Sequence, residues 1–277
     1  MTVKALKKQL MAAIAMVVVS AIALSSSTYA WFASNNTVTA TTTKVQAQAE
    51  DGLEIAVGSN VTLDSSFSTA ASASGDAVNL LPTSTIDVAN WFHASAENAA
   101  ASTATDATME KIEPDATSGI VDEKQYFLLN QFTIRTTDGG KAKDVKISEV
   151  KVTSATIAAN ALDNSLRVVV TDGESNTYFF KPTLAAGDST NNKQVESVSG
   201  TGENKVVTRT VVVLQPTKPA ENARQTILSN VNHGGKTVKV YVYYEGEDAT
   251  LYSNNISSQL KDQINVTVEF TGVDVTP

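Results

Sequence analysis

The chain has 277 residues, with 21 Lys and Arg against 29 Asp and Glu, and it contains no cysteine. Its net charge of −8 argues against nucleic-acid binding, which needs a basic face to displace counterions from phosphates. The absence of cysteine excludes disulfides, thiolate metal sites and cysteine nucleophiles. Two histidines and no recognisable hydrolase, zinc-protease or phosphate-loop motif leave few means of catalysis, so we expect a protein that is not an enzyme.

Residues 1–30 have the layout of a secretory signal peptide. Three lysines near the start precede an apolar run over Leu10–Leu24, and small residues follow. A helix over this run would reach about 22 Å, which is short of the ~30 Å hydrocarbon core of a bilayer. We therefore expect export, with cleavage by a signal peptidase between Ala30 and Trp31. An uncleaved anchor or a structural N-terminal helix is the alternative.

Short runs of β-branched and aromatic residues, bounded by Gly, Asn and Asp, make up most of residues 31–277. They predict one all-β domain: a two-sheet antiparallel sandwich of about nine strands with jelly-roll-like connections. In Thr237–Tyr244 the valines alternate with Tyr241 and Tyr243, which predicts a core face and a face toward water. The predicted strands are Val38–Glu50, Leu53–Val57, Gln125–Thr136, Val145–Thr153, Leu166–Thr171, Thr177–Lys181, Lys205–Gln215, Thr237–Tyr244 and Ile264–Phe270.

Two regions depart from this pattern. More than half of residues 65–118 are Ala, Ser or Thr, 29 of 54, so this stretch has too little apolar surface to be ordered throughout. We expect a long low-complexity insertion that crosses the surface of the sandwich. The segment Ala185–Asn204 is polar and contains Gly, which predicts a loop. The residues expected to dock the insertion are Leu80, Leu81, Ile86, Val88, Trp91 and Phe92.

An acidic cluster near the end of the chain is the one candidate for metal binding. Glu245, Glu247 and Asp248 surround Gly246, and calcium prefers six to eight hard oxygen ligands. The spacing matches no EF-hand loop, so a solvated turn after a strand is the alternative. We expect no other cofactor.

The end of the leader carries a resemblance to a known family. Ser26–Asn35, followed by Val38-Thr39-Ala40, resembles the leader junction of Gram-positive surface proteins with a SipW-type signal peptide, the TasA/camelysin family of fibre-forming matrix proteins. The resemblance implies a secreted protein at the cell surface of a Gram-positive organism. It also implies a jelly-roll sandwich that polymerises when the N-terminal segment of the mature chain inserts as a strand into a neighbouring copy. The metallopeptidase classification of camelysin is not carried over, because the chain has no zinc motif.

Residues Trp31–Glu50 suit such a donor strand on their own properties. The segment is extended in character, and its only charged residues are Lys44 and Glu50. An added strand gains affinity from main-chain hydrogen bonds and specificity from pockets for alternate side chains. The alternative is that the same residues form the first strand of their own sheet. The side chains expected to fill pockets are those of Trp31, Phe32, Val38, Val45 and Ala47.

Two functions are therefore expected from the sequence. The first is an exported structural subunit of surface fibres or biofilm matrix, whose main partner is a further copy of itself. The second is a monomeric carbohydrate-binding or adhesive module that contacts cell-wall or matrix glycans. That module would need a face of exposed aromatic residues, for which the candidates are Tyr178, Tyr241, Tyr243, Trp91 and Phe92.

Overall fold

A computed structural model describes residues 42–78, 80–94, 109–137, 141–153, 165–182, 191–200, 205–248 and 264–275. In this part of the chain the regular structure is β, apart from 3-10 turns at Asp64–Ser66 and Glu221–Ala223. The predicted all-β sandwich is confirmed, but the described residues contain sixteen strands, more than the nine or so predicted. No helix among the described residues is long and apolar enough to cross a membrane. The predicted signal peptide lies outside them.

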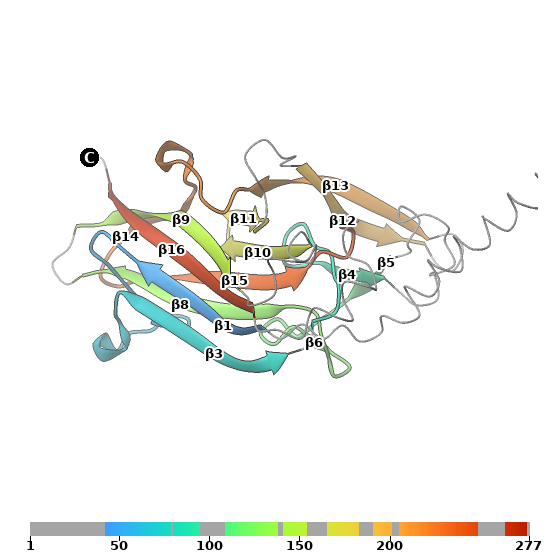
Figure 1. The fold of residues 1–277 in the computed structure, drawn as a ribbon, viewed down its shortest axis with the longest axis horizontal. Coiled ribbons are helices and arrows are strands. Elements are labelled where there is room, and N and C mark those ends of the chain that lie inside the picture. The colour runs from blue at the N-terminus through green and yellow to red at the C-terminus, as the bar shows by residue number, and fades with distance from the viewer. Residues whose placement is uncertain are drawn as a thin grey trace, which may run out of the picture.

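Two main sheets face each other, and two small hairpins accompany them (Figure 1). The small hairpins are β4 (Trp91–Ala94) with β5 (Met109–Ile112) and β6 (Ile120–Val121) with β7 (Lys124–Gln125). In spatial order, sheet A consists of β14 (Thr226–Val231), β9 (Lys143–Thr153), β16 (Ile264–Asp274), β1 (Thr42–Ala49) and β3 (Ala70–Val78). Sheet B consists of β12 (Asn191–Ser199), β13 (Val206–Gln215), β11 (Thr177–Phe180), β10 (Leu166–Thr171), β15 (Lys236–Tyr244), β8 (Leu128–Thr136) and β2 (Leu53–Val57).

The sandwich core fills the space between the two sheets. It consists mainly of aliphatic side chains from the inward faces of both sheets, such as Val266 and Val268 of β16 and Val240 of β15. These residues follow the period of two that places alternate side chains on one face of a strand. The pattern that predicted the strands is therefore the pattern that builds this core.

A second cluster, the aromatic core, covers the opposite face of sheet B. Tyr241 and Tyr243, which were predicted to face water, are 6% and 0% exposed, so that prediction was wrong. The segment Leu80–Phe92, here called the crossing segment, supplies much of the cover, and all six residues of β10 are buried from both sides. The aromatic core consists of Trp91, Ile112, Tyr126, Phe127, Val169, Phe179, Val212, Leu214, Tyr241 and Tyr243.

The regions expected to lack strands contain several. Ala70–Val78, inside the predicted insertion, is the edge strand β3 of sheet A, and β4 and β5 also fall within that insertion. Ala185–Asn204 was predicted to be a loop, but it contains β12, the edge strand of sheet B. The polar strands β3 and β12 are ordered by hydrogen bonding to β1 and β13, which local composition does not report. Figure 1 places β12, β13, β4 and β5 together at the end of the molecule opposite the C-terminus.

Candidate assembly strand and its groove

The first strand, β1, lies in the interior of sheet A. On one side it runs parallel to β16, with Val45 opposite Val266 and Ala47 opposite Val268. On the other side it runs antiparallel to β3. Both edges of β1 are therefore hydrogen-bonded, and a groove between β16 and β3 would remain if this strand were withdrawn.

The side chains of β1 divide between the core and the outer face. Val45 is 2% exposed and Ala47 is 0% exposed, and both belong to the sandwich core. Gln46 points the other way, where its Nε2 donates to Ser72 Oγ of β3 at 3.0 Å. In a single chain, β1 is thus the first strand of its own sheet, the alternative that the sequence left open. Trp31, Phe32 and Val38, and the predicted cleavage point after Ala30, lie outside the described residues.

A tight turn connects β1 to β2 and therefore to sheet B. Asp51 and Gly52 both have left-handed backbone angles, with φ of 57° and 75°. Such angles cost a residue other than glycine free energy unless its surroundings hold it in place. Here the hydroxyl of Thr271 donates to Asp51 Oδ2 at 2.5 Å. The turn packs over Gly272, where a Cβ atom would lie only 3.2 Å from the carbonyl oxygen of Asp51.

The strands at the edges of the sheets differ in how their backbone groups are used. At β2, the Ile55 amide donates to the Ser68 carbonyl at 2.7 Å, and the reverse hydrogen bond is also formed. At β14, the carbonyl of Thr226 accepts from the Tyr178 hydroxyl and that of Ser229 accepts from Lys236 Nζ. Side chains and loops thus occupy edges that could otherwise pair with another chain. Among the described strands, the edge strand β3 is hydrogen-bonded to β1 alone, so its other edge is not paired with a strand.

The acidic cluster that was predicted to bind calcium is held by protein groups. Glu247 accepts from Arg209 Nε at 2.6 Å, and Asp248 accepts from Arg167 Nη2 at 2.7 Å. Glu245 is fully buried, and that burial raises the pKa of its carboxyl to about 8, so it holds a proton at neutral pH. Within the described residues, no group of three or more acidic or histidine side chains is placed to hold a metal ion. Calcium binding at this cluster stays a prediction that the geometry does not support.

The aromatic residues proposed for glycan binding are packed inside the molecule. Trp91 stacks on Phe127 with ring centroids 4.3 Å apart, and its indole Nε1 donates to the Val88 carbonyl at 3.1 Å. Phe92 is 3% exposed and lies in a smaller cluster with Met109. Tyr178 is half-buried, and its hydroxyl is hydrogen-bonded to Thr226. These residues stabilise the fold and do not form an open stacking surface.

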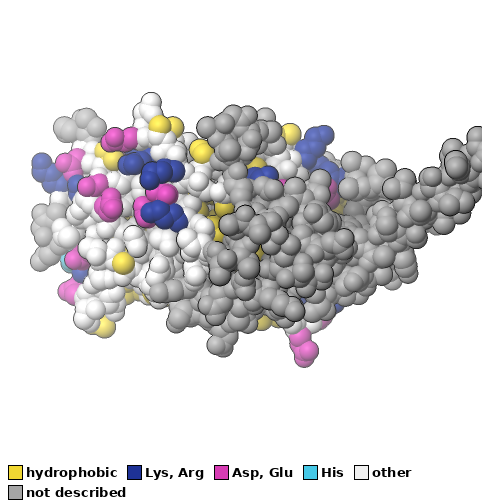
Figure 2. Space-filling view, in the orientation of Figure 1, with side chains coloured by type: hydrophobic (Ala, Val, Ile, Leu, Met, Phe, Trp, Pro, Cys, Tyr) yellow, Lys and Arg dark blue, Asp and Glu magenta, His cyan; other side chains and the backbone are white. Residues whose placement is uncertain are grey.

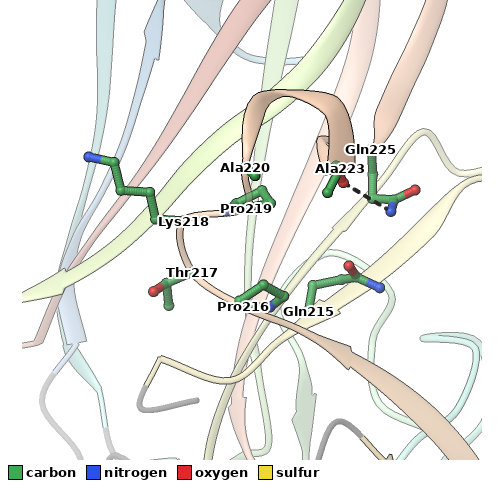
Figure 3. A pocket seen from close by; sticks show the side chains of 8 residues that line it. All are labelled: Gln215, Pro216, Thr217, Lys218, Pro219, Ala220, Ala223 and Gln225. Carbon is green, nitrogen blue, oxygen red and sulfur yellow. Dashed lines mark hydrogen bonds between the residues drawn. The ribbon is translucent and has the colours of Figure 1, made fainter. Parts of the chain in front are cut away.

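Two surface hollows lie on the described part of the chain. One of about 390 Å³ lies beside the loop after β13, where Pro216, Pro219 and Ala220 form much of its wall (Figure 3). The other, of about 480 Å³, is lined by charged side chains of both signs, including Lys146, Arg224 and Glu221. On the face of Figure 2, basic and acidic side chains are likewise interspersed. This distribution does not favour a partner of one charge sign.

Comparison of the chain with protein-family models, with curated proteins and with solved structures finds no match. The functional interpretation therefore depends on the geometry described above. The sequence predicts β1 but not its neighbour β3. The sequence signal for β3 is the alternation of Ala71 and Ala73 with Ser72. This alternation is weak because all three side chains are small.

Proposed function

We propose that this chain is an exported structural subunit of cell-surface fibres or biofilm matrix, and that its copies polymerise by exchanging the N-terminal strand. Cleavage after Ala30 would free the segment Trp31–Glu50 to leave its own sheet and enter that of the next copy. The proposal assigns no catalytic residue to the chain.

The observation that carries this proposal is the position of β1 between β16 and β3. An N-terminal strand in the interior of a sheet can be replaced by the same strand of another copy with every contact kept, including the burial of Val45 and Ala47. Exchange therefore costs little free energy beyond that of association. Each copy that donates a strand also accepts one, so the contact is head-to-tail and can propagate.

The turn after β1 supports the proposal as a hinge. Short hinge loops under strain favour exchange, because an extended linker relieves the strain. Asp51 adopts a left-handed conformation that is unfavourable for a residue with a Cβ atom. In an exchanged subunit, Asp51 and Gly52 would extend and connect β1 in one copy to β2 in the next.

The test exploits the absence of cysteine. In the chain that begins at Trp31, Gln46→Cys and Ser72→Cys would be the only thiols, and these two residues face each other across β1 and β3. Opposed residues of antiparallel strands are close enough for a disulfide. After oxidation, exchanged strands give a ladder of covalent multimers on a non-reducing gel, whereas self-paired strands give a single monomer band. Electron microscopy of the same sample shows whether filaments are present.

A matched control uses Lys193→Cys with Val211→Cys, which are opposed in the β12–β13 hairpin. This pair should give monomer bands in every condition, because the hairpin is not exchanged. Filaments accompanied by intrachain Gln46–Ser72 crosslinks would contradict the exchange mechanism. A chain that forms neither filaments nor multimers at high concentration would contradict the fibre function itself.

A further inference from the structure

One buried carboxyl group has no part in the proposed assembly. Glu245 directly follows β15, and its side chain is inaccessible to solvent. Its amide donates to the Ser165 carbonyl at 2.8 Å, just before β10. The crossing segment docks at the same point, because the Thr83 amide donates to the Tyr244 carbonyl and the Gly246 amide donates to the Thr83 carbonyl, both at 2.9 Å.

The carboxyl group connects three separate elements. Ser84 of the crossing segment hydrogen-bonds to the Glu245 side chain, and Ser84 Oγ also accepts from the Val195 amide of β12 at 2.9 Å. Tyr243 of β15 places its hydroxyl 3.4 Å from Glu245 Oε2 and 3.3 Å from Gln194 Oε1 of β12. Glu245 Oε1 accepts from the Glu247 amide at 3.1 Å. The crossing segment, β12 and the end of β15 therefore meet at this one side chain.

Hydrogen-bond accounting favours a proton on Glu245. The Tyr243 hydroxyl carries one hydrogen and has two carboxyl or amide oxygens as neighbours. If Glu245 is protonated, it can donate to the Tyr243 oxygen while Tyr243 donates to Gln194, and both contacts are satisfied. If Glu245 is ionised, one of the two oxygen pairs has no hydrogen between its atoms, unless the Gln194 amide turns over so that its Nε2, which has no hydrogen-bond partner as it lies, donates to Tyr243 Oη. Such an unsatisfied contact is costly at a buried site.

The charges around Glu245 oppose that state, but the nearby cations already pair with other carboxylates. Arg167 of β10 donates to Asp248, Arg209 of β13 donates to Glu247, and Lys181 Nζ after β11 lies 3.7 Å from Asp248. The groups that face Glu245 from the crossing segment and from β12 are Ser84 and Gln194, which carry no charge. Arg167, whose charge most favours ionisation of Glu245, thus already has a carboxylate partner in Asp248, and the burial of Glu245 outweighs its effect.

We propose that Glu245 is a proton-operated latch, which holds the crossing segment and β12 on the end of β15 while it is protonated and releases them when it loses the proton. The latch would regulate access to the aromatic core, since Trp91 belongs to the crossing segment and the hairpin of β12 and β13 carries Val212 and Leu214. This inference is independent of the proposed strand exchange.

The direction of the pH dependence follows from the two states of the carboxyl. Burial raises the pKa of Glu245 to about 8 in the closed form, against the charge of Arg167 and the hydrogen bonds from Ser84 and the Glu247 amide, which favour the carboxylate. In an open, hydrated form the pKa returns to about 4.3. Opening therefore releases a proton, and its equilibrium constant rises about tenfold per pH unit from roughly pH 5 to pH 8 before it levels off.

The test is hydrogen exchange of the Thr83, Val195 and Gly246 amides, expressed as protection factors so that the intrinsic pH dependence of exchange is removed. Protection should fall about 50-fold between pH 6 and pH 8 in the unmodified chain. In Glu245→Gln, whose amide cannot ionise, protection should be the same at both pH values. Glu110→Gln is the matched control, because Glu110 lies on β5 at the same end but pairs with Lys205 at the surface.

Two results would overturn the latch. The first is protection that does not change with pH in the unmodified chain, and the second is an unchanged pH dependence in Glu245→Gln. If Glu245→Gln does not fold, the carboxyl can be titrated directly by isotope-edited NMR in the unmodified chain. A titration above about pH 7 supports the latch, and one in the ordinary range of about 4 to 5 overturns it.

Discussion

The two cores of this molecule share sheet B but are built differently. In the sandwich core, four of the 27 buried residues are aromatic, and nearly all of the 27 come from regular strands. In the aromatic core, six of the ten are aromatic, and Trp91, Tyr126 and Phe127 come from the crossing segment and the region around β7. One core is closed by two extended sheets and the other by short hairpins and turns.

This difference implies that the two cores have different roles in stability. The sandwich core joins strands from both ends of the chain, such as β1 and β16, so its loss unfolds the whole domain. The aromatic core depends on one segment that docks through a few hydrogen bonds around Thr83 and Ser84. Local opening of such a segment requires less free energy than global unfolding. Substitutions in the sandwich core and in the aromatic core should therefore destabilise different parts of the molecule.

The largest effect is expected from a charge placed in the sandwich core. Val268 is fully buried on the central strand β16, opposite Ala47 of β1. In Val268→Asp an unpaired carboxyl would be buried, at a cost of more than about 4 kcal/mol, which is comparable to the whole stability of many domains. Urea denaturation followed by circular dichroism should show no folded baseline. Thr267→Asp, on the opposite face of the same strand, should unfold almost as the unmodified chain does.

A smaller and more local effect is expected from Trp91→Ala. This change removes the ring that stacks on Phe127 and contacts Tyr243 edge-on at 5.3 Å, at a local cost of about 3 to 5 kcal/mol. Hydrogen exchange should accelerate in the crossing segment and in β12, while β9 and β16 keep their protection. Trp91→Phe should preserve most of that protection. If the protection of β9 and β16 fell equally, the two cores would be one cooperative unit.

The same contrast explains how much of the fold could be predicted from the sequence. Strands of the sandwich core, such as β10 and β15, carry apolar β-branched residues and coincide with predicted strands almost residue by residue. The strands β3 and β12 were missed because their polar and small side chains give little local signal, and each is ordered by pairing with another strand, β1 for β3 and β13 for β12. Tyr241 and Tyr243 were assigned to water because nothing local indicates the layer that covers them.

The candidate site could be predicted in part. Its strand was selected by position and low charge, and Val45 and Ala47, two of the side chains expected to fill pockets, are buried in the sandwich core. The groove was not predicted, because it depends on the parallel pairing of β1 with β16, more than 200 positions away in the chain. The ion pairs of Glu247 and Asp248 were likewise hidden, since Arg209 and Arg167 approach from other strands.

The smallest effect concerns a second acid of the crossing segment, whose pH dependence should oppose that of Glu245. Burial by itself would raise the pKa of Asp87, but hydrogen bonds from Asn90 and Ala89 outweigh it and lower the pKa. The Asp87 carboxylate accepts from the Asn90 amide at 2.7 Å and from the Ala89 amide at 2.9 Å. These bonds hold the turn before Trp91, in which Val88 has a left-handed φ of 54°.

Asp87→Ala should therefore destabilise the docked segment by about 1 kcal/mol at neutral pH. Because the folded pKa is lowered, the contribution of Asp87 is present above its unfolded value near 4 and is lost as the pH falls further. Glu245 acts in the opposite direction, since its contribution is greatest in acid and declines as the pH rises. Protection of the crossing segment should consequently peak at about pH 4 to 5, and Asp87→Asn, which keeps an acceptor oxygen but no charge, should remove only the acid side of that peak. If the protection of the crossing segment peaked at the same pH in Asp87→Asn, another group would be responsible for the loss of protection in acid.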